Sequence, residues 1–123
     1  MGLFDTHALL YDKAFDQDRD EVIQSLRKTL DYVVIPSEDL ATSRKSLALS
    51  EKYDFLYSAV GIHPQETGDV SEEILREIGD LAESSPKVKA IGEIGLDYHY
   101  LYSDKETQFH EFLCHFSAAG VAV

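Results

Sequence analysis

The sequence is short of cysteine and of basic residues, and it has no long apolar run. Its 123 residues include one cysteine, no tryptophan, three prolines, and 11 basic residues against 23 acidic ones. A single cysteine, Cys114, excludes an intrachain disulfide, so a reducing compartment is favoured and we predict a cytoplasmic protein. Because the sequence has no signal-peptide pattern and no apolar run of transmembrane length, we expect no membrane contact.

The shortage of basic residues limits how the protein can bind a nucleic acid. The formal net charge is −12 and the sequence pI is about 4.6. Broad, sequence-independent binding to a phosphate backbone needs a basic surface, and this composition argues against it. A phosphodiester substrate held by metal ions in a small site remains compatible with the charge, because the ion supplies positive charge locally.

A glycine-rich phosphate loop is also missing, since none follows a predicted strand, and this argues against dinucleotide-binding and P-loop chemistry. The hydrophobic pattern predicts strands at 3–10, 32–35, 55–62 and 88–96, each followed by a segment with helical periodicity. This alternation is typical of parallel strands joined by right-handed crossovers. We therefore expect an α/β fold of about four βα units in one domain over 1–123, with a fifth strand beginning near Val121.

The second and fourth predicted helices begin at serine caps. Ser37 is expected to cap a helix that runs to about Lys52, and Ser103 with Glu106 forms a capping-box pattern before the last helix. Apolar spacing predicts which residues of these two helices face the core, namely Leu40, Leu47 and Ala48 in one and Phe109, Phe112, Leu113 and Phe116 in the other. The histidines at 110 and 115 are expected at solvated positions of the last helix.

The segment 87–100, KVKAIGEIGLDYHY, carries the most informative pattern in the chain. Its apolar residues predict a buried strand, and Glu93 lies in the middle of it, on the same face as Asp97. An ionised carboxylate removed from water needs a partner, a hydrogen-bond shell or a metal ion. A buried ion pair would satisfy it, but the flanking glycines favour a ligand site, so we predict a metal-binding carboxylate.

Polar side chains follow three of the predicted strands: His7 after the first, His63 after the third, and Glu93 with Asp97 after the fourth. The carboxyl ends of parallel strands are where barrel enzymes keep their sites. Taken alone, His7 is better explained as a hydrogen-bonded residue at a strand end, and His63 could equally be a loop residue fixed before a proline.

Several of these segments together resemble the TatD family of metal-dependent deoxyribonucleases, within the wider amidohydrolase-like superfamily. The resemblance covers the whole chain and is carried by LFDTHALL, FDQDRDEVI, AVGIHPQ, AIGEIGLDYHY and ETQFHEF. IGEIGLDY is the most specific of these and GIHP the next. The resemblance implies a TIM barrel of about twice this length, in which two divalent ions activate water against a DNA phosphodiester.

By the same resemblance, His7 matches the first member of the family's His-x-His pair and Glu93 matches the carboxylate that bridges the two ions. Asp5 and Asp97 would position these ligands without binding the ions themselves, and His63 would act near the phosphate of the substrate. Magnesium, manganese and zinc all fit oxygen-rich ligation with imidazole.

The sequence departs from the family pattern in two respects. The second histidine of His-x-His would fall at position 9, where this chain has Leu9, which cannot ligate a metal. The family's later ligands, two histidines and an aspartate, would lie beyond residue 123. The resemblance is thus to the N-terminal half of such a barrel.

Three functions are compatible with this pattern. The leading interpretation is a TatD-like, metal-dependent hydrolase that acts on DNA. The alternative is a catalytically degenerate half barrel with weak metal binding or a role in assembly, and a third possibility is deaminase or lactonase chemistry within the superfamily. Because a half barrel exposes two sheet edges and its inner face, we also expect a homo-oligomer.

Overall fold

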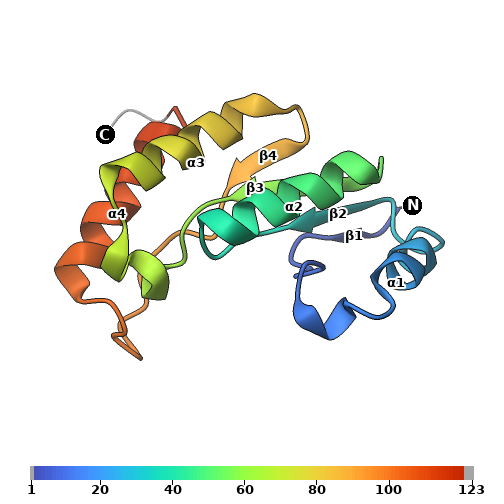
Figure 1. Ribbon diagram of the computed structural model, residues 1–123, viewed down its shortest axis with the longest axis horizontal. Helices are drawn as coiled ribbons and strands as arrows, with labels where there is room; N and C mark the ends of the chain where they lie inside the picture. The colour runs from blue at the N-terminus through green and yellow to red at the C-terminus, as the bar shows by residue number, and fades with distance from the viewer. Residues whose placement is uncertain (1, 121–123) are drawn as a thin grey trace.

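The computed structural model of the protein describes residues 2–120. Strands and helices alternate along the chain, as the hydrophobic pattern predicts (Figure 1). The elements are β1 (Phe4–Asp5), η1 (Lys13–Phe15), α1 (Arg19–Leu26), β2 (Tyr32–Ile35), α2 (Leu40–Lys52), β3 (Leu56–Val60), η2 (Pro64–Asp69), α3 (Glu72–Ser84), β4 (Val88–Ile91) and α4 (Lys105–Ala118). The expected strand at Val121 lies outside the described residues.

The four strands form one parallel sheet in the order β1-β2-β3-β4. The register places Val33 beside Leu56, and Val60 beside Ile91. Helices α2 and α3 lie along the same side of this sheet (Figure 1). Sequential parallel neighbours with helical crossovers are the arrangement expected of successive βα units, so the sheet topology agrees with the sequence prediction.

Two apolar clusters hold the helices on the sheet. One is built around Ile23, Val33 and Leu56 and joins α1 to β2 and β3, while the other joins α3 to the sheet through Val60 and Ile78. Between the strands and α2 the contact is made by small hydroxyl residues. Ser46 Oγ donates to the Ile35 carbonyl at 2.7 Å and lies 3.0 Å from Ser58 Oγ. Buried serines, with Ser43 and Ser50 among them, let α2 pack closely on β3 while every hydroxyl keeps a partner.

Strands β1, β3 and β4 are shorter than the sequence predicts, and β3 runs only from Leu56 to Val60. Strand β1 ends at Asp5, because the Asp5 carboxylate accepts the His7 backbone N–H at 2.9 Å and this local turn replaces the sheet ladder. The chain rejoins β2 one residue later, where Ala8 N–H donates to the Val34 carbonyl. Strand β4 ends at Ile91, so Glu93 lies in the connection just beyond the strand rather than in its middle.

The caps and inward faces of α2 and α4 also need correction. Asp39 caps α2 and Asp104 caps α4, each through its side-chain carboxylate, whereas Ser37 and Ser103 bond elsewhere. Ala48 is exposed. In α4 the fully buried side chains are polar (Gln108, Glu111 and His115), while Phe109 is half exposed and Phe112, Leu113 and Phe116 are only partly buried. For Gln108 and His115, hydrogen bonds to neighbouring segments outweigh apolar periodicity.

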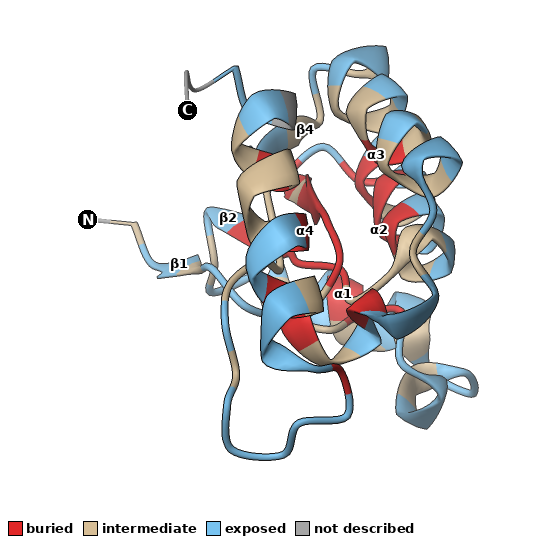
Figure 2. Cartoon of the chain, turned by 90° about the vertical axis from the view of Figure 1, so that its left-hand side faces the viewer, coloured by how far each residue is buried: buried red, intermediate tan, exposed pale blue. Residues whose placement is uncertain are grey.

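The face of the sheet opposite α2 and α3 carries aromatic side chains. The rings of Phe4 and Tyr32 stack at a centroid distance of 5.3 Å, and Tyr57 contacts Tyr32 at 5.7 Å. Phe4 and Tyr32 are exposed at 63% and 44%, and β1 is exposed in Figure 2 as well. The uncovered rings and the unpaired edges of β1 and β4 are the features on which our expectation of an oligomer rests, and that expectation stays a prediction.

Candidate functional site

The structure brings His7 and Glu93 together at the carboxyl ends of β1 and β4. His7 Nε2 lies 3.1 Å from Glu93 Oε1. The Glu93 side chain is 24% exposed and the His7 side chain 58% exposed, so the pair sits at the rim of the sheet and is open to water. These residues lie 86 positions apart, and curvature of the sheet brings the ends of its first and last strands within contact distance.

Glu93 is held by its backbone from two neighbouring strands. Its N–H donates to the Ser37 carbonyl at 2.7 Å, beyond the end of β2, and Gly92 N–H donates to Val60 at 2.9 Å. Gly61 passes directly beneath this connection. A Cβ atom at Gly61 would lie 2.7 Å from the Glu93 carbonyl oxygen and 2.8 Å from the Gly92 carbonyl carbon. Only glycine allows β3 and the Glu93 segment to approach this closely, which explains a glycine directly before Ile62-His63-Pro64.

Tyr11 lies close to the same rim. Its ring belongs to the buried cluster of α1 and β2, and its hydroxyl has no hydrogen-bond partner among the described residues. Burial, together with the nearby carboxylates of Glu38 and Glu93, raises the pKa of Tyr11 to about 12. The phenol therefore keeps its proton at neutral pH. The sequence analysis did not single out Tyr11, because a single aromatic residue carries no periodic signal.

The other predicted site residues make local contacts of their own, and none of the described contacts joins them to this pair. Asp5 orders the turn that carries His7. His63 caps η2, its Nδ1 accepting the Gln65 N–H at 3.1 Å, and its own N–H donates to the Glu38 carbonyl. Asp97 Oδ1 accepts the His99 N–H at 2.9 Å, and hydrogen bonding, first with Gln65 and then with His99, lowers the pKa of the Asp97 carboxyl.

Two glutamines that the sequence analysis did not single out organise the segment after Glu93. Gln108 is fully buried and holds Asp97 from both sides: its Oε1 accepts the Asp97 N–H at 2.8 Å, and its Nε2 donates to the Asp97 carbonyl at 2.9 Å. Gln65 Nε2 donates to the same carbonyl at 2.9 Å. Both glutamines fall in segments that carry the family resemblance, GIHPQ and ETQFHEF, and those segments were the available signal.

The donor set fits part of a divalent-cation site. His7 and Glu93 offer one imidazole nitrogen and one carboxylate at the same point, a combination that zinc, manganese and magnesium accept. Within residues 2–120, however, no three histidine, cysteine, aspartate or glutamate side chains gather closely enough to hold an ion. Leu9, at the position of the family's second histidine, instead packs against the core cluster that contains Tyr11.

His115 is buried, which corrects the expectation that it is solvated. It is only 1% exposed, its Nε2 accepts the Ile62 N–H at 3.1 Å, and its Nδ1 lies 2.6 Å from the Glu111 carbonyl oxygen. This pairing requires the neutral ring with its proton on Nδ1. The side chain thus joins α4 to the end of β3, just before His63. His110, in contrast, is exposed as expected.

We expect His115 to make the protein less stable in mild acid. Burial lowers the pKa of His115 below its ordinary value of 6.5, so the unfolded chain binds this proton at a higher pH than the folded chain does. The contribution of the neutral ring is complete above about pH 6.5 and is lost as the pH falls below it, with a slope of up to about 1.4 kcal/mol per pH unit. Urea unfolding between pH 7.5 and about 4.5 measures this loss. His115→Gln should flatten the profile, and an equal slope in that variant would contradict the assignment.

Among residues 2–120, no helix combines the length and the apolar character that crossing a bilayer requires.

Comparisons with known proteins identify relatives of this chain. The sequence model of the family described as "TatD related DNase" matches residues 4–122. A metal-dependent hydrolase of Bacillus subtilis, YabD, whose name calls it uncharacterized, is 40% identical over 111 residues, which are 89% of this chain and 43% of that protein. The 3'-5' ssDNA/RNA exonuclease TatD of Erwinia tasmaniensis is 34% identical over 112 residues, again 89% of this chain and 43% of the relative.

Solved structures show the same likeness. The crystal structure of YJJV, a TatD homologue from Escherichia coli, superposes with a TM-score of 0.85 at 28% identity, covering 95% of this chain and 46% of that one. An amidohydrolase from Saccharomyces cerevisiae superposes with a TM-score of 0.79 at 21% identity, over 97% of this chain and 44% of its own, and shows the fold alone.

The predicted fold class, about four βα units of a TIM-type barrel, is confirmed by the sheet topology together with these superpositions. The chain spans less than half the length of the relatives it matches. It belongs to the TatD related DNase family.

Proposed function

We propose that the protein acts in the metal-dependent hydrolysis of phosphodiester bonds in DNA. The observation that carries this proposal is the contact between His7 and Glu93. It joins the segment just after β1 to IGEIGLDY, the most specific motif of the chain. The names of the relatives support the reaction class, because one is called a metal-dependent hydrolase and another an ssDNA/RNA exonuclease.

In this proposal His7 and Glu93 would hold a divalent cation. A bound cation of this kind supplies a nucleophilic hydroxide at neutral pH and polarises a phosphoryl oxygen. Asp5 fixes the turn that aims His7 at Glu93, and the Gly61 contact fixes Glu93 from the other side. His63, on the loop after β3, would meet a substrate phosphate, and Asp97 would hold the chain after Glu93 in place.

A second candidate function is favoured by one observation. Leu9 occupies a core-packed position where the family has a ligand, and no third ligand joins His7 and Glu93 within residues 2–120. A non-catalytic chain that binds a metal weakly or contributes to an assembly would have this donor set.

Hydrolysis of bis(p-nitrophenyl) phosphate and of a single-stranded oligonucleotide separates the two functions. We expect both substrates to be cleaved with manganese, magnesium or zinc, to be protected by a chelator, and to survive in His7→Ala. His110→Ala is the matched control, because that histidine is exposed on α4, away from Glu93, and its loss should leave turnover unchanged. Metal binding without turnover of either substrate would favour the second candidate, and equal turnover in His7→Ala would contradict the proposed site.

A further inference from the structure

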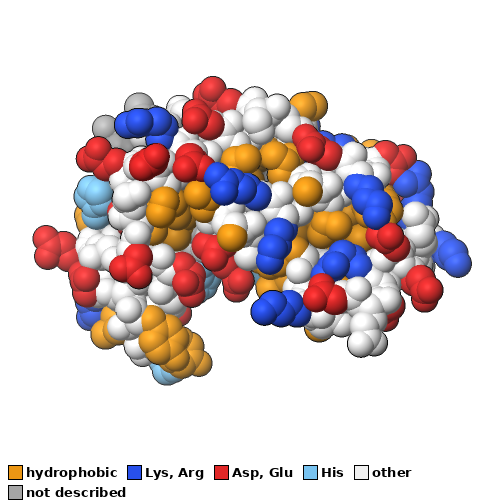
Figure 3. Space-filling view, in the orientation of Figure 1, with side chains coloured by type: hydrophobic (Ala, Val, Ile, Leu, Met, Phe, Trp, Pro, Cys, Tyr) orange, Lys and Arg blue, Asp and Glu red, His pale blue; other side chains and the backbone are white. Residues whose placement is uncertain are grey.

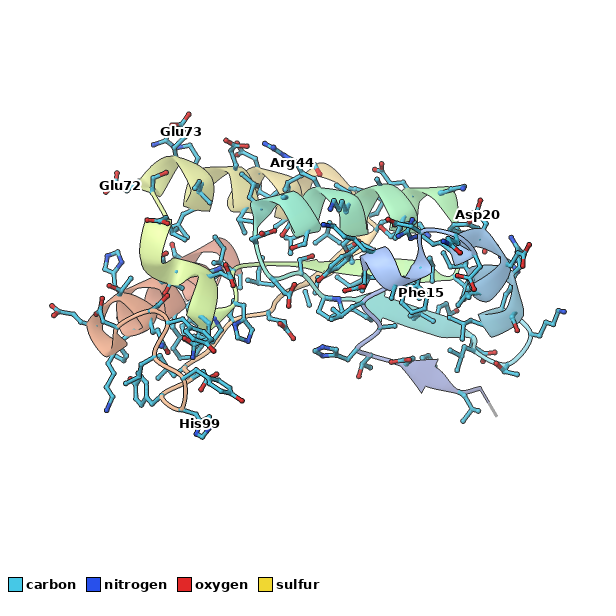
Figure 4. All side chains as sticks on the ribbon, turned by 60° about the horizontal axis from the view of Figure 1, so that its bottom comes forward. Phe15, Asp20, Arg44, Glu72, Glu73 and His99 are labelled. Carbon is cyan, nitrogen blue, oxygen red and sulfur yellow. The ribbon has the colours of Figure 1, made fainter. Side chains whose placement is uncertain are left out.

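The connection between β4 and α4 presents large aromatic side chains to solvent. Tyr98, Tyr100 and Tyr102 are exposed at 46%, 61% and 77%, and Leu101 at 46%. In Figure 1 this connection extends away from the sheet below α4, and Figure 3 shows hydrophobic side chains gathered on the same projection. His99 lies at its outer end and points away from the helices (Figure 4). We call residues 96–102 the tyrosine loop.

The tyrosine loop is held firmly although its rings are exposed. Gln65 Oε1 accepts the N–H groups of Tyr102 at 2.8 Å and Ser103 at 3.3 Å, so the C-terminal end of the loop is fixed to η2. Gln108 fixes the other end through Asp97 and also donates to the Ser103 carbonyl at 2.9 Å. Two buried or half-buried glutamines thus order a short segment that contributes no ring to either core cluster. Ordering a loop costs conformational entropy, and burial of its own rings does not offset that cost here.

The rings are arranged as an extended stack. Tyr100 and Tyr102 lie parallel, with centroids 5.6 Å apart and an interplanar angle of 7°, and His99 meets Tyr100 edge-on at 4.5 Å. Lys105 Nζ lies 4.8 Å from the centre of the Tyr98 ring. Exposed parallel rings with an adjacent cation are suited to binding flat aromatic groups by stacking.

In the sequence, the tyrosine loop follows closely after Glu93 of the proposed site. It begins three residues after Glu93, and Gln65, which fixes it, follows His63 by two residues. We propose that the tyrosine loop is a stacking platform for the bases of a single-stranded nucleic acid whose phosphates run past His7 and Glu93. The choice of ligand rests on the function proposed above, whereas the platform itself rests on the exposed and ordered rings.

Charge favours bases over the phosphate backbone as the groups that are recognised. Asp97 lies in the loop and Asp104 follows it. Hydrogen bonding lowers the pKa of both carboxyls, with Gln65 and then His99 for Asp97 and with Thr107 for Asp104, so both are ionised at neutral pH. With a net charge of −12, the surface repels phosphate, and Lys105 is the cation placed over the loop. Affinity therefore comes from stacking, which every base offers and which only a single strand leaves accessible.

Fluorescence anisotropy with the 123-residue chain tests the platform. The probe is a labelled oligothymidylate of about 12 nucleotides, a length within the usual range for stacking sites, and a chelator in the buffer prevents cleavage. Tyr100→Ala and Tyr102→Ala should each weaken binding on the order of tenfold. Tyr100→Phe and Tyr102→Phe keep the ring and should bind as the wild type does. Phe109→Ala is the matched control, since Phe109 is a half-exposed ring on α4 outside the loop.

An abasic oligomer of the same length separates bases from backbone and should bind at least about tenfold more weakly than oligothymidylate. Photo-crosslinking of an iodouracil oligonucleotide to the wild-type chain should label the peptide that contains the tyrosine loop, which keeps the test valid if a variant folds poorly. Equal affinity in the alanine variants, equal binding of the abasic oligomer, labelling elsewhere, or no binding at all would each overturn the platform. A change only in self-association in the alanine variants would also overturn it, because the loop would then be a contact between copies.

The two proposals fail in different assays. Oligonucleotide binding is measured with a chelator present and does not depend on turnover, whereas hydrolysis of bis(p-nitrophenyl) phosphate tests turnover alone. Oligonucleotide binding at the loop without hydrolysis of this compound would count against the catalytic proposal alone.

Discussion

Glu93→Gln is expected to abolish phosphodiester hydrolysis and to weaken divalent-cation binding by about 100-fold or more. The substitution keeps the size of the side chain and the backbone bonds to Ser37, but it removes the negative charge that faces His7. Loss of a group that only supports a metal ligand already costs about 10–100-fold in affinity, and Glu93 would be a ligand itself. Isothermal titration with manganese and turnover of bis(p-nitrophenyl) phosphate measure the two effects.

Glu73→Gln is the matched control for this experiment. Glu73 lies in the first turn of α3 and is exposed, and Figure 4 shows it at the far side of the molecule from His99. The control changes the net charge by the same amount, so it reports the general loss of electrostatic attraction for a cation. If the two variants bind manganese equally, Glu93 is not a metal ligand in this chain. Unfolding in urea should be similar for all three proteins, because the Glu93 side chain is partly exposed.

The alternation of strands and helices was predictable because it depends on local patterns. Apolar runs such as Tyr32–Ile35 and the stripe around Ile78 report burial on one face, and they need no knowledge of distant partners. The ends of the strands were harder to predict. The Asp5 turn and the backbone bonds at Gly92 stop β1 and β4 earlier than their apolar residues suggest, because local hydrogen bonds compete with the ladder there.

The inner face of α4 could not be predicted from periodicity. Its phenylalanines form the more regular apolar stripe, yet Gln108 and His115 are the residues that are fully buried. Their burial depends on acceptors and donors at Asp97 and Ile62, which are remote in sequence and visible only in the folded chain. Polar residues of this kind carry no hydrophobic signal, so pattern analysis assigns them to solvent.

The candidate site was predicted in part. The expectation that His7 and Glu93 converge came from their positions after the first and fourth strands together with the family resemblance, and the two side chains are in contact. Their roles as metal ligands stay predictions. Tyr11 was missed, because its place near Glu93 depends on how the loop after His7 folds onto α2.

Leu9→His is expected to raise affinity for zinc by about 10–100-fold. Residues 7 and 9 flank Ala8, whose N–H bonds to Val34 of β2, and the Leu10 N–H bonds back to the Ala8 carbonyl, so position 9 lies in the turn that follows His7. A histidine at position 9 would add a second imidazole to the His7 and Glu93 pair. The change also removes a leucine from the edge of the core cluster, with an expected cost in the free energy of unfolding of about 1–2 kcal/mol.

Leu9→Asn separates the two effects, because asparagine has the same loss of apolar packing but is a much weaker zinc ligand. Calorimetric titration with zinc should show higher affinity for Leu9→His alone, and both variants should lose a similar amount of stability in urea. Zinc should then raise the unfolding midpoint of Leu9→His more than that of the wild type, since a ligand that binds the folded state stabilises it by mass action. Equal zinc affinity in all three proteins would mean that position 9 does not face Glu93, and the assignment of His7 as a ligand would fall with it.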